Sequence, residues 1–131
     1  MGSVLRASSA VIGNALSTTR AYIRSNRDGV VRFLRSLVEG QHRLRTDKEF
    51  SMKVLSKYTK TVDPEILGEL YQIYGVRYAG QPIPYVRLEG IDEILKGADS
   101  KEARQSRATD FVDNSLLKEI EQSGVLKKFS R

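Results

Sequence analysis

The sequence predicts a mainly α-helical fold, with about five helices and one strand. Three observations support this prediction. Apolar residues recur at spacings of three and four in several windows, which is the period of one helix face. Helix-start residues of the Ser, Thr, Asp and Asn type precede most of these windows. Only the stretch 15–19 combines moderate strand propensity with no helical stripe.

The first long helix is predicted from an apolar stripe between residues 30 and 44. Ser25 stands three residues before Asp28, so we expect a capping box at the helix start. Arg32, Arg35 and Arg43 fall between the apolar positions and are expected to face solvent. The stripe consists of Val30, Phe33, Leu34, Leu37, Val38 and Leu44.

Two further helices are predicted in the middle of the chain. Thr46 followed by Glu49 predicts a second capping box, and this helix should end near residues 59–61. Asp63 and Pro64 predict the next start, because Asp is a favoured N-cap and the first helical turn does not use the N–H that proline lacks. Their apolar stripes contain Phe50, Val54, Leu55, Tyr58, Ile66, Leu67, Leu70, Tyr71 and Tyr74. We expect the three tyrosines to be core residues.

Short elements are predicted after residue 75. Pro82 and Pro84, with Gly80, predict an extended connector over 75–87. Apolar residues at 88, 91, 94 and 95 predict a helix that stops near residue 97, and 98–110 should form a loop or a weak helical turn. Asn114 is expected to cap a last helix that ends at Gly124, after which 125–129 fold back onto the body.

The predicted strand at 15–19 raises a question of pairing. The backbone N–H and C=O groups of a strand need partners on neighbouring strands. The chain does not obviously contain such neighbours.

The composition restricts the class of protein. The chain has 131 residues, 40% of them hydrophobic, which suits one ordinary domain. Charges or glycines interrupt every apolar run before the roughly 18 residues that a membrane span needs. Gly13 and Asn14 interrupt the weakly apolar stretch near the N-terminus, so we expect no signal peptide in this chain. The absence of cysteine excludes disulfides and thiolate metal sites.

The combinations of residues that are typical of catalytic and metal sites are missing from the sequence. His42 is the single histidine, so neither a Cys/His pair nor a two-histidine metal site can form, and we expect it at the surface near a helix C-terminus. The glycines form neither phosphate-loop signature. We therefore predict no enzymatic activity, no metal and no cofactor.

The excess of positive over negative charge is confined to the first part of the chain. Residues 1–48 contain nine Lys and Arg against three Asp and Glu, whereas the remainder has thirteen of each sign. Arginines could neutralise the phosphates of a nucleic acid. These arginines are spaced around several helix faces, however, and no nucleic-acid-binding motif accompanies them. A stand-alone basic helical module that binds nucleic acid or an acidic partner is therefore the alternative hypothesis.

Six segments, taken in order, resemble a known family. They are STTRAYIRSNRD (17–28), VVRFLRSLVEG (30–40), TDKEFSMKVLSKY (46–58), DPEIL (63–67), IPYVRLEGI (83–91) and DFVDNSLLKEIEQSG (110–124). The ordered series resembles the C-terminal part of ABC-transporter substrate-binding proteins of the nitrate, sulfonate, taurine and thiamine-pyrimidine-precursor family. The resemblance covers residues 14–131, which leaves 1–13 as an N-terminal tail.

The resemblance implies a parent fold of the α/β class, the type II periplasmic binding protein, in which two lobes close on a small solute. It implies a periplasmic or exported location for the family and an ABC permease as a partner. Family members are about twice as long, so we expect this chain to be a fragment that lacks the N-terminal lobes. The strand at 15–19 would cross between the lobes, and Asn14, Ser17 and Thr18 would lie nearest the ligand cleft. Some relatives of this fold are pyridoxal-dependent enzymes, but the matched region has no suitable Lys and His pair.

Overall fold

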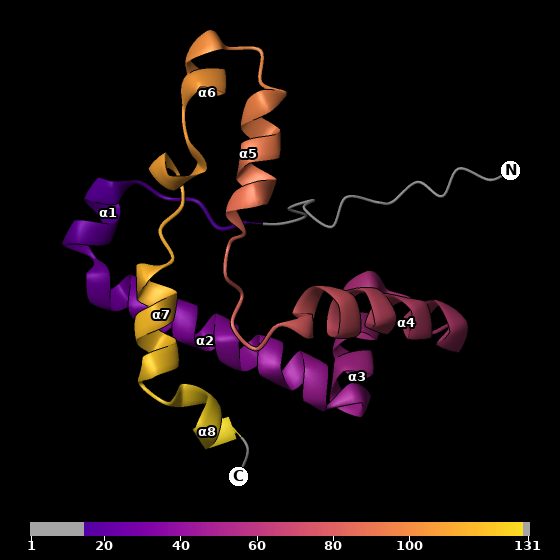
Figure 1. Cartoon of the computed structure of the whole chain (residues 1–131). Helices are drawn as coiled ribbons and strands as arrows, with labels where there is room; N and C mark the ends of the chain where they lie inside the picture. The colour runs from indigo at the N-terminus through magenta and orange to yellow at the C-terminus, as the bar shows by residue number, and fades with distance from the viewer. Residues whose placement is uncertain (1–14, 130–131) are drawn as a thin grey trace, which may run out of the picture. The chain divides into compact units, whose positions relative to one another are not determined.

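The structure is a computed structural model that describes residues 15–129. It contains helices and, within this range, no strand, which confirms the mainly α prediction (Figure 1). The described residues form two compact units. The larger unit comprises 20–84 and 115–129, and the smaller comprises 15–19 and 85–114.

Helix α2, Arg27–Thr46, is the longest element of the larger unit and confirms the first predicted helix. The short helix α1, Arg20–Ser25, precedes it and was not predicted. The capping box at Ser25 is wrong, because Asn26 is the N-cap residue and makes no side-chain cap hydrogen bond. Ser25 instead closes α1, where its hydroxyl donates to the carbonyl of Ala21 at 3.0 Å.

Helix α3, Lys48–Thr59, is capped by the residue after the one predicted. Asp47 is the N-cap, and its carboxylate accepts a hydrogen bond from the Phe50 N–H at 3.0 Å. Thr46 still belongs to α2, and its hydroxyl donates to the His42 carbonyl at 2.9 Å. The helix is followed by its C-cap residue, Lys60, whose φ of 61° is left-handed.

Helix α4, Pro64–Tyr71, starts as predicted. Asp63 is extended, and its carboxylate accepts from the backbone N–H groups of Glu65 at 2.9 Å and Ile66 at 3.3 Å. Proline occupies the first turn, where no N–H partner is needed. The cap and the proline together fix the helix start to one residue.

The predicted connector at 75–87 is partly wrong. A π-helix, η1 (Gln72–Arg77), continues from α4, and a 3₁₀ turn, η2 (Tyr78–Gly80), follows it. Regular helix stops only before the prolines, and 81–87 have no helix. Proline disfavours helical backbone at its own position and at the residue before it, but it does not prevent a helix several residues upstream.

The core of the larger unit lies where α7, Ser115–Gln122, and α8, Val125–Phe129, pack against α2 (Figure 1). Val38 of α2 is fully buried, and Leu116, Leu117 and Ile120 of α7 are buried. Gly124 separates the two helices with a φ of 72°, a left-handed conformation that glycine adopts without strain. Residues 125–129 therefore fold back onto the body, as predicted.

Several apolar residues that were predicted to be buried are exposed. Tyr71 is buried, but Tyr58 is 76% exposed and Tyr74 is 42% exposed, so their assignment to the core is wrong. Phe33 and Leu37 of the α2 stripe are also exposed. Periodicity identifies a helix face, but burial requires a neighbouring element that covers it.

The smaller unit contains α5 (Leu88–Lys96), α6 (Lys101–Gln105) and a 3₁₀ turn, η3 (Ala108–Asp110). The predicted helix with its stop at Gly97 is confirmed, and the predicted weak turn is α6, capped by Ser100. Asn114 directly precedes α7, and its amide accepts from the Val86 N–H at 3.1 Å and donates to the Val86 carbonyl at 2.9 Å. These two hydrogen bonds join the beginning of segment 85–114 to its end.

The strand predicted at 15–19 is wrong for this chain. These residues have irregular backbone and are all exposed. The physical reason is the one that the sequence raised: a strand needs a neighbouring strand, and residues 15–129 contain none.

Candidate functional site

The predicted ligand residues do not form a pocket in the described part of the chain. Ser17 and Thr18 are exposed on the irregular segment before α1. Asn14 lies outside the described residues. Neither of the two pockets described below includes a residue of this segment.

The arginines of the basic region have different environments. Arg27 of α2 forms an ion pair with Glu119 of α7, which ties the two helices together. This contact raises the pKa of the Arg27 guanidinium, chiefly through the hydrogen bond to Glu119. Arg43 lies 3.5 Å from the centroid of the Phe50 ring and 3.7 Å from the Asp47 carboxylate. These two arginines therefore contribute to the packing of α2.

Three other arginines of α1 and α2 are exposed and form no ion pair with the residues that the structure describes. They are Arg24, Arg32 and Arg35. Their charge is available to an external anion.

His42 is half-buried, which corrects its predicted surface position. Its ring lies 5.2 Å from the Phe129 ring, centroid to centroid, so the imidazole packs α2 against α8. An Arg45 nitrogen approaches its Nδ1 at 3.5 Å. His42 therefore contributes to the packing of α8 on α2, and it lies near the C-terminal end of α2, as predicted.

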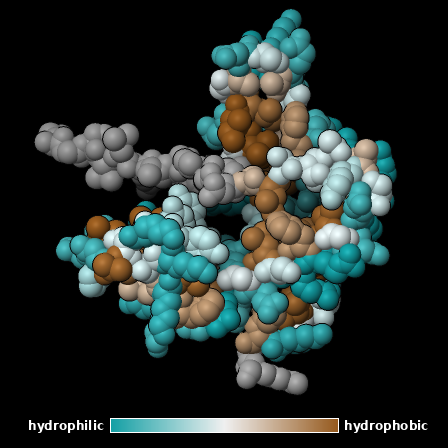
Figure 2. Space-filling model, turned by 180° about the vertical axis from the view of Figure 1, so that it is seen from behind, coloured by the Kyte–Doolittle hydropathy of each residue, from teal (hydrophilic) through white to brown (hydrophobic). Residues whose placement is uncertain are grey.

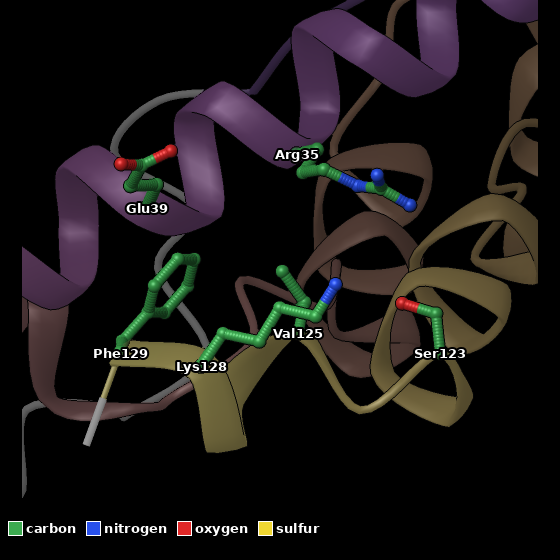
Figure 3. Close-up of a pocket in the computed structure, with 6 residues that line it drawn as sticks. All are labelled: Arg35, Glu39, Ser123, Val125, Lys128 and Phe129. Carbon is green, nitrogen blue, oxygen red and sulfur yellow. The ribbon is translucent and has the colours of Figure 1, made fainter. Parts of the chain in front are cut away.

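A pocket of about 250 Å³ lies between α2 and the α7–α8 segment (Figure 3). Its lining combines charged and polar side chains with two apolar ones, Phe129 and the buried Val125. The lining residues are Arg35 and Glu39 from α2, with Ser123, Val125, Lys128 and Phe129. This pocket gathers three charged side chains, more than the second pocket described below, and is the candidate site.

A second pocket, of about 350 Å³, lies beside α3 and is mostly apolar. Its single charged residue, Lys53, pairs with Glu49 at 2.7 Å, and this contact raises the pKa of the Lys53 ammonium. Its hydroxyl residue, Ser56, already donates to the Thr61 carbonyl at 2.6 Å. Both polar side chains of this pocket therefore already have a partner within the chain.

The sequence carried no signal for the first pocket. Arg35 and Lys128 are far apart in the chain, and only the packing of α8 on α2 brings them to one cavity. Residues 15–129 contain no cluster of three or more His, Cys, Asp or Glu that could hold a metal ion. In the same range, no helix combines the length and apolar character that a bilayer crossing requires.

Comparison of the chain with protein-family models, with curated protein sequences and with solved structures finds no match.

Proposed function

We propose that this chain is the C-terminal segment of the solute-binding component of an ABC importer for small anionic or nitrogen- and sulfur-containing solutes. In this proposal the helices are scaffold, and N-terminal lobes complete an α/β parent fold and its ligand cleft. An ABC permease at the membrane is the partner. Nitrate, sulfonates, taurine and thiamine precursors are the candidate solutes.

The observation that carries the proposal is the amount of large apolar side chain at the surface. Figure 2 shows hydrophobic residues on the face in view, among hydrophilic ones. Exposed apolar residues occur in both units, from Phe33 and Tyr78 in the larger to Ile94 and Phe111 in the smaller. In this proposal further protein covers part of this apolar surface, since exposed apolar patches mark protein interaction sites.

The irregular segment 15–19 supports the same proposal. Its exposed Ser17 and Thr18 could serve a cleft only if other elements supplied the opposite wall. Strands of an upstream lobe would supply that wall.

The test begins with the coding region upstream of Met1. An in-frame continuation that encodes alternating strands and helices is the expected result. The longer protein should then bind one of the candidate solutes in calorimetry, and Ser17→Ala with Thr18→Ala should weaken that binding. Ser36→Ala is the control, because its hydroxyl is exposed and donates within α2 to the Arg32 carbonyl at 3.1 Å.

Two outcomes would contradict the proposal. One is tight binding of a candidate solute by the present chain alone that Ser17→Ala with Thr18→Ala weakens, which would mean that this cleft needs no further lobe. The other is an upstream region with no in-frame continuation.

The second candidate function is a basic module that binds nucleic acid or an acidic partner. It is favoured by the exposed Arg24, Arg32 and Arg35, which form no ion pair with the described residues. Phosphate contacts would make such binding fall steeply with salt. A gel-shift assay that shows no retardation at low ionic strength would remove the nucleic-acid part of this candidate.

A further inference from the structure

The helices around the pocket, α2, α7 and α8, are joined by several contacts. At one end of α2, Arg27 pairs with Glu119 of α7. At the other end, His42 packs on Phe129. Val38 and Ile120 are buried in the same region, so apolar packing also joins the helices. The helices that carry the lining residues are therefore joined to one another without any ligand.

Two cations face this pocket. In the view of Figure 3, the guanidinium of Arg35 and the ammonium of Lys128 lie toward the side where Ser123 stands, whereas the carboxylate of Glu39 lies at the opposite end. Neither cation forms an ion pair with any residue from 15 to 129. The Ser123 hydroxyl donates to the Ile120 carbonyl at 2.6 Å, so the donors for a ligand come from the two cations.

We propose that this pocket binds a small oxyanion, with a carboxylate, phosphate or sulfate group held between Arg35 and Lys128. The planar guanidinium can donate two parallel hydrogen bonds to such a group, and the ammonium supplies a second charge. Val125 and Phe129 supply apolar surface for a short hydrocarbon attached to the anion. The anion is either a free solute or the headgroup of an anionic lipid, since both present the same oxygens.

This inference does not depend on the proposed function. None of the pocket residues is among Asn14, Ser17 and Thr18, and the pocket lies entirely within the larger unit. The presence of an anion site in this pocket therefore does not depend on what the upstream region encodes.

The test is a titration of the full chain with inorganic phosphate at constant ionic strength, followed by amide chemical shifts. We expect saturation, with the largest shifts at residues 35 and 123–129. Arg35→Gln and Lys128→Gln should each raise the Kd at least about tenfold, because each removes a positively charged hydrogen-bond donor.

The matched control is the double variant Arg32→Gln with Lys127→Gln. Both residues are exposed on α2 and α8, and neither lines the pocket. The double variant removes at least as much positive charge as either pocket variant, so a Kd within about twofold of the wild type is expected if the pocket recognises the anion. Far-UV circular dichroism shows whether each variant remains folded.

A second arm distinguishes the two sources of the anion. Vesicles of phosphatidylglycerol are compared with vesicles of phosphatidylcholine. Binding to phosphatidylglycerol that Arg35→Gln abolishes supports a lipid headgroup, and saturable phosphate binding without vesicle binding supports a free anion. The proposal is overturned if neither ligand binds with a Kd below about 10 mM, or if the control double variant loses as much affinity as the pocket variants.

Discussion

The ring of Tyr71 occupies the space that a side chain at Gly75 would need. A Cβ built on Gly75 would lie 2.7 Å from Cε2 and 2.9 Å from Cδ2 of Tyr71. The ring is held there because Tyr71 is only 6% exposed and its hydroxyl donates to the Arg45 carbonyl at 3.0 Å. One glycine thus permits the close packing that joins α4 and η1 to the end of α2.

Gly75→Ala should therefore destabilise the fold by about 1–3 kcal/mol, because the new methyl group overlaps a ring that cannot easily move. Urea denaturation followed by circular dichroism measures the change. Gly68→Ala is the matched control on α4, since its Cβ would meet nothing within 4 Å. The control should stabilise by about 0.5–1 kcal/mol, because alanine loses less backbone entropy than glycine in a helix. Equal effects of the two substitutions would contradict the close contact at Gly75.

Tyr71→Phe should cost about 0.5–1.5 kcal/mol, because the hydrogen bond to the Arg45 carbonyl is lost while the ring remains. The same denaturation assay measures it. Tyr58→Phe is the control, because Tyr58 is 76% exposed, and it should leave stability unchanged. A neutral Tyr71→Phe would mean that the hydroxyl does not anchor the ring.

Asp63→Ala should lower stability by about 0.5–2 kcal/mol through loss of the α4 N-cap. Asp63→Asn should restore most of the loss, because its amide oxygen can accept from the same Glu65 and Ile66 N–H groups. Thermal unfolding of the three proteins gives the comparison. If Asn fails to restore stability, the side-chain oxygen is not the cap.

Asn114→Ala should speed amide hydrogen exchange at Val86, because its N–H loses the acceptor that lies at 3.1 Å. Asn114→Asp keeps an acceptor oxygen but cannot donate to the Val86 carbonyl. The Val86 amide should therefore stay protected in Asn114→Asp and become exposed in Asn114→Ala. Equal protection in all three proteins would exclude this pairing.

Glu102 should titrate below its ordinary value of 4.5. The pKa of its carboxyl is lowered chiefly by a hydrogen bond from its own backbone N–H, and further by the Ser100 hydroxyl at 3.0 Å. Because the folded pKa is depressed, the contribution to stability is present above pH 4.5 and is lost as the pH falls through the lower folded value. Carbon-detected NMR of the carboxyl group gives the midpoint. Ser100→Ala should raise it and Ser100→Thr should not, whereas a midpoint at or above 4.5 in the wild type would contradict the contact.

Local sequence signals predicted most of the helices and one of their caps. Asp63 with Pro64 fixed the start of α4, because a cap and a missing N–H act within a few residues of each other. The caps at Ser25 and Thr46 were wrong by one residue, because each hydroxyl instead donates to a carbonyl of its own preceding helix. A capping residue is chosen by where the previous helix ends, and that end depends on packing.

What the sequence alone determined about this protein is its helical character, because side-chain period and capping chemistry are local properties. The tertiary structure decided which apolar residues are covered: Tyr71 is buried beside Gly75, whereas Tyr58 remains exposed. It also decided that Arg35 and Lys128 share one pocket. No periodicity encodes a contact between residues so far apart in the chain, since such a contact exists only once α8 has packed on α2.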